Sequence, residues 1–298
     1  MQRASEAQPF RAGAKRDQLS SKSLRARHMT PAHLSCLSKT ERVLRTSDGR
    51  SVEVWDLIVP ADAALLSSWA KDFRQHYCLD AEIDGLREGT GLSRTQYLIQ
   101  LVFPDESRAP GPAIRSGDFA ELLIADYVEH LLGYSVPRSK YAAKASRDES
   151  VKGVDILGFK LASISSATPA DSLLAFETKA QLTGNTYNGK LQDAIDASSI
   201  DSIRLGMTLN ATKRRLLNAG DRVQALVVQR FQNPTDNPYV YLSGAAAVLS
   251  DAAYDEASLQ LSTAAAHINQ QRLRLIVVRG ADLMSLVHAI YKKAADEA

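Results

Sequence analysis

Residues 153–181 read GVDILGFKLASISSATPADSLLAFETKAQ, and the rest of the chain is expected to be organised around this stretch. It contains two apolar runs of strand length, residues 154–159 and 172–176, which are rich in Val, Ile, Leu and Phe. The segment between them is made of Ser, Ala, Thr, Pro and Asp and has no capacity to form a core. This pattern predicts two strands joined by a turn, that is, a β-hairpin.

Three charged residues lie on this predicted hairpin. Asp155 lies in the first run, and Glu177 and Lys179 follow directly after the second. Because side chains alternate along a strand, Glu177 and Lys179 share one face and Thr178 is turned away, while strand pairing brings Asp155 close to them. Two carboxylates and a lysine beside an apolar sheet are suited to hold a hard divalent cation through oxygen ligands and to act on a phosphodiester.

The composition excludes several classes of protein. A chain of 298 residues, 45% hydrophobic and 23% charged, is typical of a globular protein with one large domain or a domain with a small appendage. The net charge of +2 is too small for a general attraction to nucleic acid, so any basic surface must be local. Cys36 and Cys78 stand alone, which argues against a structural zinc site, and no apolar run has the length of a membrane span. We therefore expect a reduced, cytoplasmic protein with no membrane partner.

The chain divides into three parts. Residues 1–35 are polar and basic, which predicts a disordered tail. Residues 36–110 predict a small α+β region, with a hairpin around Ser47-Asp48-Gly49, a helix over 61–77 and a strand over 96–103. A segment with three prolines and a glycine, residues 104–112, suggests a soft boundary before the main region, residues 111–298.

The main region alternates strands with helices. Ser116-Gly117-Asp118 is a predicted N-cap for a helix that continues to Leu132. Further patterns predict short strands over 239–242 and 273–278 and helices over 190–203, 208–218, 251–270 and 282–297. This order predicts an α/β (mixed α+β) fold class, with a central mixed sheet flanked by helices.

Two further groups of residues are candidates for the site, each with two interpretations. Glu121, in the first turns of the predicted helix, either complements the helix dipole or supplies another carboxylate to the cation. Arg138, Lys140 and Lys144 lie in a basic segment just upstream of Asp155, where they form either a solvated loop or contacts to phosphate.

The order of a helix with Glu121, a strand with Asp155 and a second strand with Glu177-Thr178-Lys179 resembles the PD-(D/E)xK nuclease superfamily. The resemblance implies a restriction-endonuclease-like core and a Mg²⁺-dependent (or Mn²⁺-dependent) deoxyribonuclease. It makes Asp155, Glu177 and Glu121 metal ligands, Lys179 the catalytic lysine, and Gln181 a substrate or water contact. Val154 stands where the superfamily has its nominal proline, and the distance along the chain from Asp155 to Glu177 is long.

At finer grain, residues 117–140, 153–155 and 275–298 look like the nuclease subunit of Hachiman-type bacterial antiphage defence systems. This resemblance implies DNA as the substrate and a helicase subunit as the partner. The helicase would restrain the nuclease until foreign or damaged DNA is sensed.

Two other functions stay open. In the first, the protein is a non-catalytic nucleic-acid-binding or regulatory subunit on the same fold, in which Asp155, Glu177 and Lys179 form only an ion-pair network. In the second, it is a different magnesium enzyme acting on phosphate esters. The sequence has no GxxxxGK[ST] phosphate loop, which argues against an NTPase.

Overall fold

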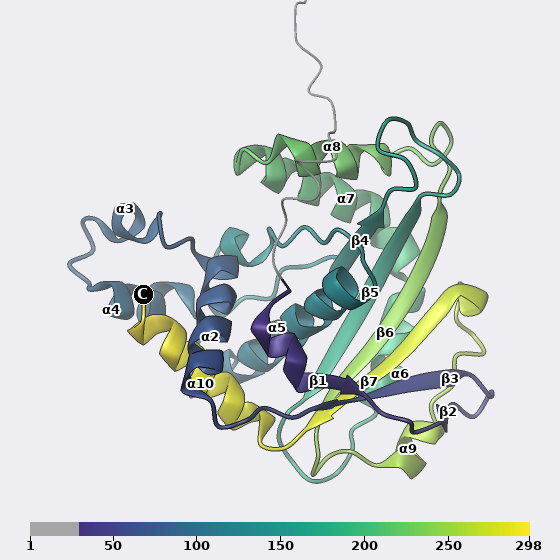
Figure 1. Ribbon diagram of the computed structural model, residues 1–298, viewed down its shortest axis with the longest axis horizontal. Coiled ribbons are helices and arrows are strands. Elements are labelled where there is room, and N and C mark those ends of the chain that lie inside the picture. Colours follow the sequence, from purple (N-terminus) through teal and green to yellow (C-terminus); the bar gives the residue numbers. More distant parts are fainter. Residues whose placement is uncertain (1–29) are drawn as a thin grey trace, which may run out of the picture.

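The computed structural model describes residues 30–298, and most of the predicted tail lies outside this range. Within the described residues, seven strands form one sheet (Figure 1). Six of them follow the order β1-β3-β7-β6-β5-β4, and the seventh, β2, also pairs with β3. The strands are β1 (Leu37–Lys39), β2 (Leu44–Arg45), β3 (Ser51–Leu57), β4 (Ile156–Lys160), β5 (Ser172–Gln181), β6 (Val240–Ser250) and β7 (Leu273–Gly280).

The sheet is mixed, as the sequence predicts. Strands β3, β7, β6 and β5 run parallel to one another, whereas β1, β2 and β4 run antiparallel to their neighbours. The predicted hairpin over residues 153–181 is confirmed, since β4 pairs with β5 in the register Ile156↔Phe176. Strand β5 is also the long partner of β6, from Ser172↔Val240 to Gln181↔Leu249.

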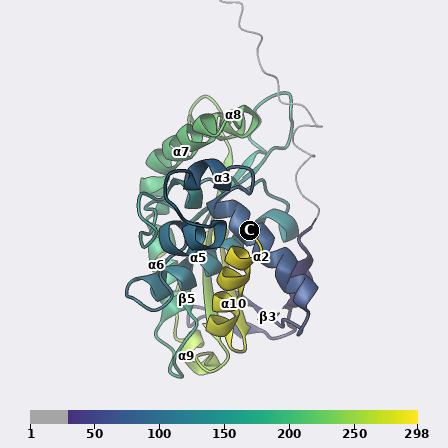
Figure 2. The same cartoon turned by 90° about the vertical axis from the view of Figure 1, so that its left-hand side faces the viewer.

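Helices cover both faces of the sheet, because the strands are apolar on both sides. Phe176, Val248 and Ile276 pack on one face with α2, α5 and α10, while Ala175 and Val277 pack on the opposite face, which α6, α7 and α8 cover (Figures 1 and 2). The α-helices are α2 (Ala63–Tyr77), α3 (Ile83–Arg87), α4 (Arg94–Tyr97), α5 (Gly111–Asp126), α6 (Lys190–Ser199), α7 (Asp201–Asn218), α8 (Arg222–Arg230), α9 (Glu256–Gln260) and α10 (Leu283–Asp296). Shorter helical turns are η1 (Ala32–Cys36), η2 (Leu98–Val102), η3 (Tyr127–Leu131), η4 (Tyr141–Ala143) and η5 (Gln270–Arg272).

The N-terminal strands belong to the same sheet as the rest of the chain. β3 pairs in parallel with β7, with Val54 opposite Val277, and α2 packs against α10. His33 and Leu34, at the end of the predicted tail, are buried in η1. The strands of the predicted N-terminal region therefore extend the sheet of residues 111–298.

Several predicted elements differ from the structure. The helices predicted over 190–203 and 208–218 meet instead at Ile200, because α6 ends at Ser199 and α7 begins at Asp201. Residues 96–103 form α4 and η2 and not a strand, because Ser93 and Gln96 make a reciprocal capping box that starts a helix. Helix α5 begins at Gly111, before the predicted cap, since a proline is well tolerated in the first turn. The helix predicted over 251–270 is reduced to α9 and η5. Strand β6 continues to Ser250, although its alanines carry little strand propensity.

None of the helices among residues 30–298 combines the length and the apolar character needed to cross a membrane.

Candidate active site

The β4–β5 hairpin places Asp155 beside Glu177. In this register Ile156 is opposite Phe176, so the next antiparallel step puts Asp155 opposite Glu177. The backbone N–H of Thr178 donates to Asp155 Oδ2 over 3.0 Å. The sequence prediction that these two carboxylates converge is therefore supported by the register and by this hydrogen bond.

Glu177 and Lys179 share one face of β5, as the alternation of side chains predicts. Lys179 Nζ donates to Glu177 Oε2 over 3.2 Å. The Glu177 residue is only 2% exposed, whereas Lys179 is partly exposed. A buried carboxylate is thus paired with a lysine that reaches toward solvent.

Helix α7 adds two residues that the sequence analysis missed. Asp201 is fully buried, and its Oδ1 lies 3.0 Å from Arg204 Nη2. The same Arg204 nitrogen lies 3.7 Å from Glu177 Oε1. Within residues 30–298, Glu177 Oε1 and both Asp201 oxygens are buried without accepting a hydrogen bond. The only sequence signal is an Asp/Arg pair three residues apart at a helix start, which is common on solvated helices.

Glu121 reaches the same region from the other side of the sheet, on α5. Tyr141 Oη donates to Glu121 Oε2 over 2.9 Å, and Lys140 Nζ forms an ion pair with the same oxygen. Lys140 Nζ also lies 3.9 Å from Asp155 Oδ1. Lys140 therefore links the helix carboxylate to the hairpin carboxylate.

Burial perturbs the ionisation of three of these carboxyl groups. Burial, followed by the nearby charges of Asp155 and Asp201, raises the pKa of Glu177 to about 9. Burial and then Asp155 raise the pKa of Glu121 to about 7, and burial raises the pKa of Asp201 to about 7. Burial alone would lower the pKa of Lys179, but Asp155 and Glu177 outweigh it and raise that pKa. Such a cluster of raised carboxyl pKa values is typical of functional sites.

Gln181, predicted as a substrate or water contact, has an internal role in this structure. Its Nε2 donates to Thr186 O over 2.7 Å, and its Oε1 accepts from Asn188 N over 2.9 Å. Gln181 therefore shapes the loop that follows β5, on the same face of the strand as Glu177 and Lys179.

All three predicted phosphate-binding residues are engaged with carboxylates, Lys140 with Glu121 as described above. Arg138 forms ion pairs with Asp126 over 2.6 Å and with Glu129 over 2.7 Å. Lys144 forms an ion pair with Asp118. A contact from any of the three residues to phosphate would require these pairs to open.

The donor set fits a hard divalent cation in kind. Carboxylate oxygens are the ligands that Mg²⁺ prefers, and Glu177 Oε1 is a buried oxygen with no hydrogen-bond donor among residues 30–298. Among residues 30–298, however, no three His, Cys, Asp or Glu side chains lie close enough together to hold a metal ion as they stand. Lys179 and Lys140 hold the other oxygens of Glu177 and Glu121, so these lysines would shift when a cation binds.

Comparison with models of protein families gives a match. A protein-family model described as HamA matches residues 31–294, which is nearly all of the described chain. This match supports the resemblance to the nuclease subunit of Hachiman-type systems. No curated protein matches the sequence.

Proposed function

The chain belongs to the HamA family, which identifies it as a component of a Hachiman-type antiphage defence system, and on this premise we propose that it is a metal-dependent nuclease that hydrolyses DNA phosphodiester bonds. The observation that carries the proposal is the geometry of the β4–β5 hairpin. It joins Asp155, the buried Glu177 and Lys179 in one place, with Glu121 reaching the same region from α5.

Each residue has a role in this proposal. Asp155, Glu177 and Glu121 would hold Mg²⁺ or Mn²⁺ through their oxygens. The ion would supply positive charge to the phosphate and lower the pKa of its bound water. Lys179, which is partly exposed, would donate a hydrogen bond to the attacking water and add positive charge where the phosphate becomes more negative.

The burial of the cluster supports a cation as its missing component. Glu177 Oε2 accepts from Lys179, but the buried Oε1 accepts no hydrogen bond within residues 30–298. A buried carboxylate oxygen in this state is costly, and a nearby positive charge offsets that cost. Arg204 lies close to Glu177 Oε1, but the 3.7 Å separation is longer than a hydrogen bond. A divalent cation would offset the negative charge of Glu177 and Asp155 together and favour the ionised form of Glu177 at neutral pH.

One observation favours the alternative, a non-catalytic nucleic-acid-binding or regulatory subunit. Glu177 is paired with Lys179, and Glu121 is paired with Lys140. If the protein is such a subunit, these ion pairs are permanent. If it is a nuclease, the ion pairs open when a metal ion binds to the carboxylates. The two functions differ in whether a metal changes these pairs.

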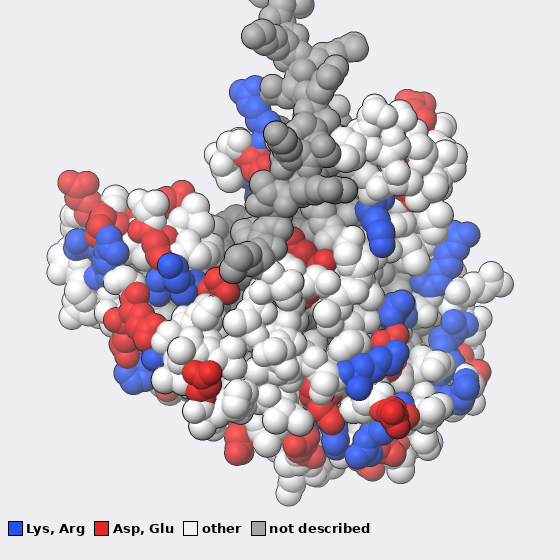
Figure 3. All heavy atoms as spheres, in the orientation of Figure 1, with Lys and Arg blue, Asp and Glu red and all other residues white. Residues whose placement is uncertain are grey.

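We also propose the partners that the resemblance implies. DNA would be the substrate, with Lys140 near the reacting phosphate, and a helicase subunit would restrain the nuclease. On the face shown in Figure 3, acidic and basic side chains are mixed, so contact with DNA through this face would depend on local groups of cations. The helicase rests on the family resemblance alone.

Cleavage of DNA tests the proposal. The purified chain is incubated with supercoiled and linear DNA in Mg²⁺, Mn²⁺ or EDTA, alone and with its helicase partner, beside Glu177→Gln and Lys179→Ala variants. We expect metal-dependent degradation that both variants abolish, while Glu41→Gln, an exposed control, keeps full activity. A folded chain that binds DNA but cleaves none under any of these conditions would support the non-catalytic alternative.

A further inference from the structure

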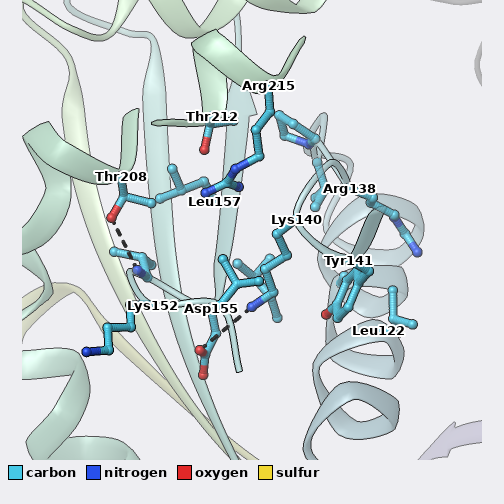
Figure 4. Close-up of a pocket in the computed structure, with 16 residues that line it drawn as sticks. Leu122, Arg138, Lys140, Tyr141, Lys152, Asp155, Leu157, Thr208, Thr212 and Arg215 are labelled. Carbon is cyan, nitrogen blue, oxygen red and sulfur yellow. Dashed lines mark hydrogen bonds and ion pairs between the residues drawn. The ribbon is translucent and has the colours of Figure 1, made fainter. Parts of the chain in front are cut away.

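A pocket adjoins the candidate active site on the side of α7. It lies between residues 136–141, residues 151–157 and α7, and Asp155 is part of its wall (Figure 4). The cavity measures about 30 Å³, which leaves room for a small polar group and not for a nucleobase.

The wall of this pocket is strongly basic. Four of its lining residues are cationic and one is anionic: Arg138, Lys140, Lys152 and Arg215 against Asp155. Hydroxyl groups of Thr208 and Thr212 from α7 complete the polar part of the lining. Arg138 and Lys140 are already paired with carboxylates, whereas Lys152 and Arg215 form no ion pair within residues 30–298, and these two cations make the pocket suited to an anion.

Arg215 is the partly buried cation of this wall that lacks an anion among residues 30–298. It is half-buried and points from α7 into the pocket, and it makes no side-chain hydrogen bond or ion pair with any other residue of the range 30–298 (Figure 4). The other well-buried arginines of the described chain differ: Arg230, for example, is held by both oxygens of Asp171. A partly buried guanidinium without a partner is costly unless a ligand supplies the negative charge.

The guanidinium group is also the side chain best matched to a phosphate. Its planar fork donates two parallel hydrogen bonds to phosphate oxygens. Lys152, which is exposed at the mouth of the pocket, would add a second positive charge. Lys140 is held by Glu121 and lies near Asp155, so it connects the pocket to the candidate metal ligands.

We propose that this pocket binds a backbone phosphate of the DNA next to the one that is cleaved, and that Arg215 is the residue that contacts it. This inference rests on the proposed function, because it takes DNA to be the substrate. The bound phosphate would fix the position of the strand relative to Asp155 and Glu177, which makes Arg215 a substrate-binding residue.

Binding of DNA in the absence of cleavage tests the inference. A short fluorescein-labelled duplex is titrated with the full chain in EDTA, at several salt concentrations, and fluorescence anisotropy reports the affinity. We expect Arg215→Gln to weaken binding by about tenfold and to reduce the slope of log K against log [salt] by about one. Arg215→Lys, which keeps the charge, should recover most of the slope.

Arg214 provides the matched control, because it is the preceding residue of the same helix but is exposed. Arg214→Gln should leave the affinity and the slope close to those of the unchanged protein. A methylphosphonate oligonucleotide of the same sequence, whose backbone carries no charge, should bind equally to the unchanged protein and to Arg215→Gln. Equal effects of Arg214→Gln and Arg215→Gln, or a loss at Arg215 that persists on the uncharged backbone, would overturn the inference.

These outcomes separate the inference from the proposed function. If the protein cleaves DNA but Arg215→Gln behaves like Arg214→Gln, the nuclease stands and the phosphate pocket is wrong. If Arg215→Gln loses affinity only for the charged backbone while no condition produces cleavage, the pocket stands and the nuclease is wrong.

Discussion

Glu177 follows the apolar run of β5 and lies inside this strand, and the residue is 2% exposed. Asp155 and Asp201 act on it from the neighbouring chain segments, and together with burial they raise its pKa to about 9. At neutral pH the group therefore holds a proton in the absence of a cation. A metal ion would displace this proton, so metal binding and proton release are expected to be coupled.

This raised pKa predicts how stability depends on pH. The ordinary pKa of a glutamate is 4.5, and the folded value for Glu177 is about 9, so between these values the folded state keeps a proton that the unfolded state has lost. Folding stability should therefore fall as pH rises from about 5 to about 9, with each lost kcal/mol lowering Tm by about 2–4 °C. Differential scanning calorimetry at pH values across this range measures the change in Tm.

Glu177→Gln should reduce this decline, because the amide does not ionise, whereas the raised pKa values of Glu121 and Asp201, both about 7, keep a part of it. The exposed control Glu41→Gln should retain it. Addition of Mg²⁺ should restore stability to the unchanged protein at the alkaline end and should have little effect on Glu177→Gln. Identical pH profiles for the two variants would show that Glu177 is not the group responsible.

At the scale of elements, the contact between β5 and β6 holds Glu177 in place. Phe176 lies opposite Gly244 in this pair, and a Cβ atom on Gly244 would overlap the phenyl ring. Strand β6 can therefore lie this close to β5 only with glycine at that position.

Gly244→Ala is predicted to destabilise the protein by about 1–3 kcal/mol, because β6 would have to move away from the ring. The shift would reach Glu177 through the next ladder position, so DNA cleavage should fall as well. Gly206→Ala is the matched control, since this glycine lies exposed within α7 with open space around it. Thermal unfolding compares the two variants, and an equal Tm for both would contradict the close packing of β5 against β6.

The hairpin could be predicted from the sequence because its signals are local. The two apolar runs, the polar segment between them and the alternation of Glu177 and Lys179 all lie within residues 153–181. The approach of Asp201 depends instead on how α7 packs on the sheet, and no spacing in the sequence encodes it. The same is true of β6, whose alanines become a strand through pairing with β5 and β7 on both sides.

At the scale of the whole molecule, the sheet joins segments from both ends of the chain. β3 pairs with β7, and α2 packs on α10, so residues 36–110 complete the core of residues 111–298. A fragment of residues 111–298 would expose the edge of β7 and the apolar face of α10.

We therefore predict that the fragment of residues 111–298 does not fold cooperatively by itself. Thermal unfolding followed by circular dichroism, with the full chain as the control, measures this. The full chain should show one sharp transition and the fragment a broad one or none. A fragment with a sharp transition at the same temperature would show that the two parts fold independently.

We propose that Asp155 and Glu177 hold the cation on which DNA cleavage depends. Crystals of the full chain grown with Mn²⁺ test this proposal, because anomalous scattering locates the ion. We expect a peak bound by Asp155 and by Glu177 Oε1, with Lys179 displaced from Glu177, and no such peak in Glu177→Gln crystals. A Mn²⁺-saturated crystal in which Lys179 still donates to Glu177 and no peak lies near these carboxylates would contradict it.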